Sequence, residues 1–161
     1  MWILELPPFA PFLIIAIACL FTHGRLTSLL LLIAPIWGVI NLWHLPAGSI
    51  WHTSFLSMQL TPLRIDSLSQ IFGYVFHLAA FISIIFALHV KDRMQQLATL
   101  VYTSAALGAV FAGDLLTLFI FWELMAVSSV FLIWARRTTR AFSSGFRYLV
   151  YQFVSGLLLL A

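Results

Sequence analysis

The residue with the most unusual chemical setting is Glu123, which lies in the run DLLTLFIFWELM, residues 114–125. Apart from the aspartate and the threonine near its start, the other side chains of this run are apolar. Moving an ionised carboxylate out of water is costly unless it is paired or hydrogen-bonded. Its charge state responds to desolvation and to nearby cations, so it can take up and release a proton. The chemistry that this residue indicates is proton transfer.

If residues 114–135 form a helix, Glu123 has only apolar neighbours on its own face. At about 100° per residue these neighbours are Leu116, Phe119, Ile120, Ala126, Val127 and Val130. The polar residues Asp114, Thr117 and Ser128 lie elsewhere around the helix. A partner for Glu123 must therefore come from another helix or from water. The alternative is a protonated acid that only hydrogen-bonds between helices, although intramembrane ionisable residues by default mark ion or proton pathways.

His77 is a second candidate for a proton relay. It shares one stripe of the segment 67–88 with Gln70 and Tyr74. A lone histidine is more often satisfied by local hydrogen bonds, and the relay role is the alternative. The histidines show no i,i+3 or i,i+4 pairing, so no helical metal site is expected: they are His23, His44, His52, His77 and His89.

The segment 143–161 carries a polar arc of about 140°. The arc consists of Arg147, Tyr148, Tyr151, Gln152 and Ser155. One interpretation is hydrogen bonding between helices, with Arg147 reaching to the aqueous surface. The other is one wall of a hydrated inlet from the cytoplasm. Arg147 lies too near the inner end of the segment to pair directly with Glu123.

The composition is that of a polytopic membrane protein. The 161 residues are 63% hydrophobic and only 8% charged, with a mean hydropathy of +1.07, whereas soluble domains are about a quarter charged. The single cysteine, Cys19, rules out an internal disulfide framework. We find no phosphate-binding loop, nucleophile elbow or nucleic-acid module, and we expect no cofactor, no metal and no nucleic-acid partner.

The apolar segments predict a single all-α membrane domain, a bundle of about six transmembrane helices. Each span needs roughly 20 mostly apolar residues. The predicted spans are 6–22, 26–44, 67–88, 96–113, 114–135 and 143–161. The connection of about 45–66 is the longest, and it suggests a short hairpin or an extended lid.

The positions of lysine and arginine predict the direction of these spans. Six of the eight basic residues fall in the first, third and fifth connections: Arg25, Lys91, Arg93, Arg136, Arg137 and Arg140. Because basic residues favour the cytoplasmic side, the N-terminus is expected outside, as are the 45–66 connection and Arg64.

Two stretches of the sequence carry a family resemblance. FAGDLLTLFIFWELMAVSSVFLIW (residues 111–134) closely resembles the fifth-helix signature of the antiporter-like subunits of respiratory complex I. That family includes subunits of multi-subunit cation/proton antiporters and of membrane-bound hydrogenases. LRIDSLSQIFG (residues 63–73) resembles the segment that leads into the family's third helix.

The resemblance implies an ion-translocating subunit of a larger membrane complex, moving protons or Na⁺ in a bacterial plasma membrane. The family's fifth-helix glutamate, which works with a lysine on a broken seventh helix, corresponds to Glu123. No counterpart of that lysine is present, so we expect an N-terminal part of such a subunit or one half of a split protein. These subunits hold no redox cofactor, although the parent complex can be an NADH dehydrogenase. The alternative is a structural or assembly membrane protein that retains a non-transporting, antiporter-like half.

Overall fold

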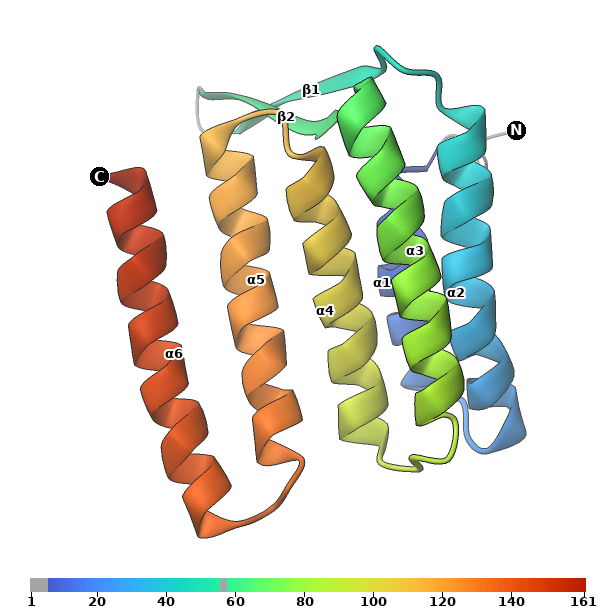
Figure 1. Ribbon diagram of the computed structural model, residues 1–161, viewed down its shortest axis with the longest axis vertical. Helices are drawn as coiled ribbons and strands as arrows, with labels where there is room; N and C mark the ends of the chain where they lie inside the picture. Colours follow the sequence, from blue (N-terminus) through green and yellow to red (C-terminus); the bar gives the residue numbers. More distant parts are fainter. Residues whose placement is uncertain (1–5, 56–57) are drawn as a thin grey trace.

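The computed structural model describes residues 6–55 and 58–161. Within these residues the chain forms an up-and-down bundle of helices with a β-hairpin across one end (Figure 1). The elements in chain order are α1 (Ala10–Cys19), α2 (Arg25–His44), β1 (Ile50–Phe55), β2 (Met58–Arg64), α3 (Ser67–Ala87), α4 (Arg93–Phe111), α5 (Leu115–Trp134) and α6 (Thr139–Leu160). The helical bundle expected from the sequence is confirmed.

Three of the described helices, α2, α3 and α5, are long and apolar enough to cross a membrane. Helix α1 is apolar but has only 10 residues. Helices α4 and α6 have 19 and 22 residues, but their polar residues lower the mean hydropathy. These apolar helices identify the chain as an integral membrane protein. The six spans and the outside N-terminus stay predictions.

Helix α1 is much shorter than the predicted span 6–22. It extends over about 15 Å at 1.5 Å per residue, roughly half of a 30 Å hydrocarbon core. Pro7 and Pro8 explain the late start, since each disfavours the helical conformation in the residue before it. The carbonyl oxygens of Pro8 and Phe9, just before the helix, accept hydrogen bonds from side chains of α3 and α4. Helix α1 therefore begins inside the bundle, beside the middle of α3 and α4.

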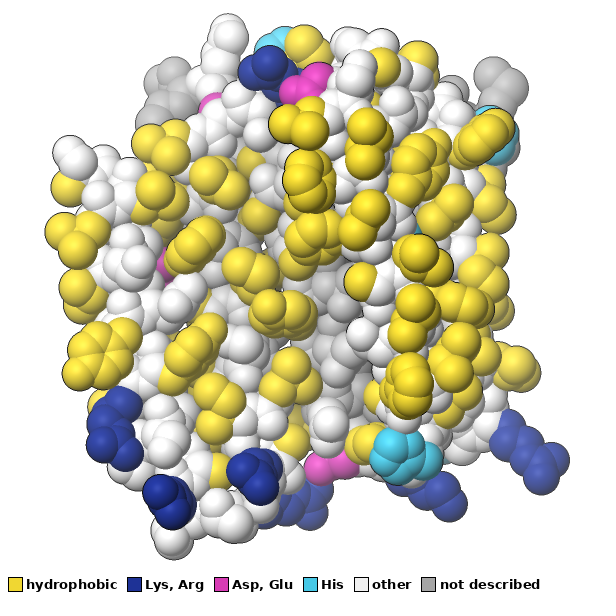
Figure 2. Space-filling view, viewed as in Figure 1, with side chains coloured by type: hydrophobic (Ala, Val, Ile, Leu, Met, Phe, Trp, Pro, Cys, Tyr) yellow, Lys and Arg dark blue, Asp and Glu magenta, His cyan; other side chains and the backbone are white. Residues whose placement is uncertain are grey.

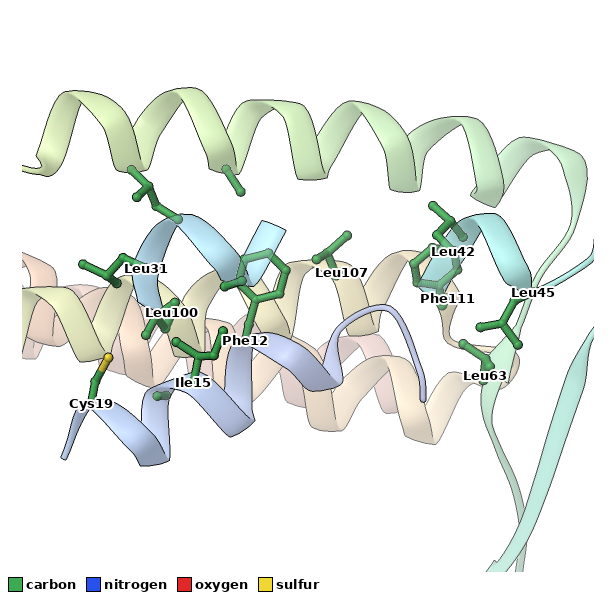
Figure 3. Close-up of a cluster of buried hydrophobic side chains, with 14 of the residues drawn as sticks. Phe12, Ile15, Cys19, Leu31, Leu42, Leu45, Leu63, Leu100, Leu107 and Phe111 are labelled. Carbon is green, nitrogen blue, oxygen red and sulfur yellow. The ribbon is translucent and has the colours of Figure 1, made fainter. Parts of the chain in front are cut away.

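The hydrophobic core surrounds this short helix. Phe12, Ile15 and Cys19 of α1 are buried against Leu31 of α2 and Leu100 of α4 (Figure 3). A second part of the same core lies toward the hairpin, and it consists of Leu42, Leu45, Leu63, Leu107 and Phe111. Helix α5 packs on α4, and α6 packs on α5 at the edge of the bundle (Figure 1). The tightly packed part of the molecule is thus α1–α4, and α6 is its least covered helix.

The connection 45–66 forms the hairpin, which is one of the two structures that the sequence suggested. Strands β1 and β2 pair antiparallel with Ile50 opposite Arg64 and Thr53 opposite Leu60. The register is irregular between Trp51 and Thr53. A bulge of this kind increases the local twist and shields the strand edge. The hairpin lies across the ends of the helices that are remote from the basic connections (Figure 1).

Candidate functional site

Glu123 lies near the middle of α5, where this helix packs against α6. Both of its carboxylate oxygens are shielded, and neither has a hydrogen-bond partner among the described residues. Leaving an ion of this size without a partner costs several kcal/mol. The sequence predicted that no polar side chain on the same face of α5 would pair with Glu123, and none does among the described residues. No charged or polar side chain from α6 supplies a partner within the described residues.

Gly156 of α6 makes the room for the Glu123 carboxylate. A Cβ atom built on Gly156 would overlap Oε1 of Glu123, and it would lie only 3.1 Å from Cε2 of Phe119. Gly156 is buried although most of its neighbours on α6 are exposed. Its missing side chain is therefore a notch in α6 that receives the acid of α5. The sequence reasoning missed this residue, because its partner is known only once the two helices are in register.

The polar arc of α6 divides into two ridges of residues spaced four apart. Tyr148, Gln152 and Gly156 form the ridge next to α5, where the hydroxyl of Ser129 donates to that of Tyr148 at 3.1 Å. Arg147, Tyr151 and Ser155 form the other ridge and are exposed, Tyr151 by 75%. The structure thus brings Tyr148 and Gln152 to the interface that holds Glu123. It places Arg147 near the basic end of α6, outside this interface.

His77 lies in the core of the bundle, on α3, and is 1% exposed. Its Nδ1 is 2.7 Å from the carbonyl oxygen of Gly73, and its Nε2 is 3.2 Å from that of Pro8. Its ring also packs on Phe12, with the centroids 5.6 Å apart. Gly38 of α2 closes the pocket, because a Cβ there would overlap the imidazole. These contacts tie the segment before α1 to α3, and the structure does not bring His77 to Glu123.

Asp114 is a structural residue that the sequence reasoning did not single out. One oxygen accepts from the backbone N–H of Thr117 at 2.7 Å, as an N-cap of α5 does. The other accepts from the Thr117 hydroxyl and from the backbone N–H of Thr61 in β2, each at 2.6 Å. The Gly113 N–H donates to the Thr61 carbonyl at 2.9 Å. The Asp114 carboxylate therefore joins the hairpin to the start of α5. The sequence signal for this helix cap was the three-residue spacing from Asp114 to Thr117.

The pKa of Asp114 reflects these contacts. Partial burial works to raise the pKa of the carboxyl, but the hydrogen bonds from Thr117, Thr61 and Leu116 outweigh it and leave the pKa below the ordinary aspartate value. Each of these bonds favours the ionised form, because a carboxylate accepts better than a carboxylic acid. Asp114 is thus held ionised as the clamp between hairpin and helix.

Fold and site together define a class of protein: a polytopic membrane helix bundle with a shielded, unpartnered carboxylate at the interface of two helices. Residues 112–161, which include α5 and α6, match the family model described as NADH:quinone oxidoreductase/Mrp antiporter, transmembrane. Through this segment the chain is similar to the antiporter-like membrane proteins of complex I and Mrp type. The resemblance stated from the sequence is confirmed there. A search of curated proteins gives no match.

Proposed function

We propose that the chain is an ion-translocating membrane subunit, or part of one, of a complex I-like NADH:quinone oxidoreductase or a multi-subunit cation/proton antiporter. In this proposal Glu123 is the intramembrane carboxylate that takes up and releases a proton, or binds Na⁺. The observation that carries it is the position of this acid. It lies in the segment that matches the family, near the middle of an apolar helix, with two shielded oxygens and no partner among the described residues.

The energetics of the site favour a functional acid over a structural one. A structural intramembrane acid normally forms hydrogen bonds that compensate for its burial, and such groups are otherwise rare and expensive. Glu123 occupies a notch at Gly156 instead, without such a bond to any described residue. The site therefore holds the acid in position but leaves its oxygens available. An ion, water or a residue of another segment can serve as its counterpart during transport.

The ridge of α6 that borders α5 is the proposed route to this acid. Tyr148 and Gln152 lie on this ridge, between the basic end of the bundle and Gly156. Their side chains can form hydrogen bonds with water or with nearby polar groups. The exposed ridge formed by Arg147, Tyr151 and Ser155 is the proposed wall of the cytoplasmic inlet. Arg147 would form part of the polar mouth of this inlet rather than pair with Glu123.

The exposed polar ridge also supports partner subunits or further helices beside α6. Polar side chains at membrane depth face protein or a water-filled cavity rather than lipid. Within the described residues, α6 packs chiefly on α5. We therefore propose that another membrane segment covers α6, as expected in a multi-subunit complex. The proposed arrangement is a single membrane domain of six spans in a bacterial plasma membrane, with the N-terminus outside.

The competing proposal is a structural or assembly subunit without transport. The His77 contacts and the Asp114 clamp are consistent with it, because both are used in holding the bundle together. A relay role for His77 stays a secondary proposal, since both ring nitrogens already face backbone carbonyls. Only Glu123 distinguishes the two functions, because nothing in the fold requires its charge.

The experiment is transport by vesicles that carry the complete complex with Glu123→Gln or Glu123→Asp. Glutamine keeps the size and the hydrogen-bonding capacity but cannot titrate, so the complex should assemble and ion movement should stop. Aspartate keeps the titrating group with one methylene less, and part of the activity should remain. Assembly is checked independently by the subunit composition of the purified complex.

The ranking of the two variants separates a relay from simple burial. A neutral amide is cheaper to hold in the membrane than a carboxylate. If burial alone mattered, glutamine would be tolerated at least as well as aspartate. Normal ion movement by an assembled Glu123→Gln complex would refute the proposed function.

A further inference from the structure

We propose that the basic end of the bundle holds a binding site for the phosphate group of an anionic phospholipid, separate from the Glu123 site. The site is a pocket of about 490 Å³ between the α1–α2 connection and the α3–α4 connection. Its lining residues with charged or hydrogen-bonding side chains are Thr22, His23, Arg25, Thr27, Ser28, Lys91, Arg93 and Gln96. No aspartate or glutamate lines it. The pocket therefore combines three permanent cations with no opposing charge.

Arg93 is held in place at the back of this pocket. Its Nη2 donates to the carbonyl oxygen of Cys19 at 3.0 Å, and its Nη1 donates to Nε2 of His23 at 3.2 Å. Among its other N–H donors, the one on Nε is buried and has no partner among the described residues. A shielded guanidinium donor without an acceptor is costly, and guanidinium geometry suits phosphate oxygens. A phosphate in the pocket would supply an acceptor for the guanidinium group.

Arg25 and Lys91 are available to the same ligand. Both side chains are exposed, and within the described residues neither takes part in a hydrogen bond or ion pair. The nearest acid, Asp92, is engaged elsewhere: one oxygen caps the Met94 N–H of α4, and the other pairs with Arg137 at 2.9 Å. The two free cations are therefore not neutralised within the described part of the chain.

The first turn of α2 adds a second source of positive potential. Its N-cap is Gly24, at φ 68, and no side chain caps the helix. The first N–H groups of a helix carry about half a positive charge and bind anions readily. Gly24, Arg25, Thr27 and Ser28 of this turn all line the pocket. Most non-glycine residues would be strained at Gly24, so glycine allows the turn to open without a capping side chain.

The surroundings favour a lipid over free phosphate as the source of this group. Phe21 is 81% exposed and Leu26 and Leu29 are more than half exposed, all on the segments that form the pocket. Figure 2 shows basic side chains gathered at the lower end of the bundle and hydrophobic side chains over the flank above them. A ligand with a phosphate and acyl chains can contact both surfaces. Basic pockets at the membrane surface are a known setting for anionic headgroups.

The test is native mass spectrometry of the full chain in detergent, titrated with phosphatidylglycerol, with phosphatidylcholine or with inorganic phosphate. The test variant is Arg25→Gln/Lys91→Gln, and the matched control is Arg136→Gln/Arg140→Gln, which removes equal charge at the same end but outside the pocket. Each cation near a membrane surface contributes about fivefold in affinity. The pocket variant should bind phosphatidylglycerol about 25-fold more weakly, and the control within about twofold of the parent chain.

Each possible result either supports or overturns the proposed lipid site. Preference for phosphatidylglycerol over phosphatidylcholine, lost in the pocket variant and kept in the control, supports the site. Equal loss in both double variants would show diffuse surface attraction and overturn it. Binding of inorganic phosphate as tight as that of the lipid would overturn the lipid assignment. Neither Arg25 nor Lys91 has a side-chain partner among the described residues, so folding should survive their replacement. Circular dichroism checks this. Arg25→Gln alone should still show about a fivefold loss of affinity.

Discussion

Replacing Gly156 by alanine tests whether the notch in α6 positions the carboxylate of α5. The added Cβ would overlap Oε1 of Glu123 and press on the ring of Phe119. The Glu123 carboxyl group is at the end of a flexible side chain, so it can avoid the new methyl group. To do so it must leave its present position. We expect Gly156→Ala to loosen the α5–α6 contact and to lower ion movement in an assembled complex.

The magnitude follows from the geometry. Forcing a side chain about 30° from its preferred rotamer costs about 0.5–1.5 kcal/mol, and overpacking a tight contact typically costs about 1–3 kcal/mol. Alanine also gains up to about 1 kcal/mol over glycine in a helix. That gain is the same whether or not the acid is present. A double-mutant cycle with Glu123→Ala cancels it and should leave a coupling of about 1 kcal/mol between the two positions.

The cycle is measured as the free energy of unfolding in mixed detergent micelles, followed by tryptophan fluorescence. The matched control is Gly145→Ala, which meets Nε1 of Trp134 on the same pair of helices. Its effect should add to that of Glu123→Ala within about 0.3–0.5 kcal/mol. If Gly156→Ala is equally additive, the notch does not position the acid and the reasoning is wrong.

Three other outcomes are expected. In a Cys19-free chain in intact cells, a membrane-impermeant thiol reagent should label His52→Cys but not Arg137→Cys; the reverse pattern would invert the predicted topology. Tyr151 and Val150 are both exposed in the chain. A cysteine at position 151 should nevertheless react with a water-soluble thiol reagent from the cytoplasmic side much faster than one at position 150. Equal protection of the two cysteines would mean that the polar arc of α6 only packs against a neighbouring helix. Asp114→Asn should release the hairpin and speed its amide hydrogen exchange. The pKa of Asp114 is lower in the folded state, so its stabilisation is complete above the unfolded pKa and is lost as pH falls through the folded pKa. Acid below the folded pKa should therefore mimic the variant in the parent chain.

Much of the fold was accessible from the sequence because apolar length and charge placement are local signals. The largely apolar segment 114–135 around Glu123 predicted α5 within a residue or so at each end. The first span shows where this reasoning fails. Hydropathy alone extended it over 6–22, whereas the prolines before Phe9 delay the helix and the chain enters the bundle as a non-helical segment. Its unpaired carbonyls are satisfied by His77 and Ser104, which are about 70 and 95 residues away in sequence.

The candidate site, like the fold, was predicted from the sequence only where its signals are local. A carboxylate in an apolar run can be recognised from residue types, and its lack of a polar neighbour follows from helical spacing. Gly156, in contrast, is one of 8 glycines, and nothing in its local sequence marks it. Its role depends on the register between two antiparallel helices, which is set by side-chain packing. For the same reason the arc on α6 could not be divided in advance into a ridge facing α5 and an exposed ridge.

The location of Glu123 in the bundle bears on how a change in its charge could be transmitted. Close-packed interiors resist displacement and hold side chains in single rotamers. Helices α1–α4 form such an interior, and the hairpin fixes the outer end of α5 through Asp114. Helix α6 packs chiefly on α5 in the described chain, and two glycines on it receive α5 side chains. A proton gained or lost by Glu123 therefore acts at the contact between α5 and α6. The coupling measured between positions 123 and 156 thus also measures how far the acid controls the placement of α6.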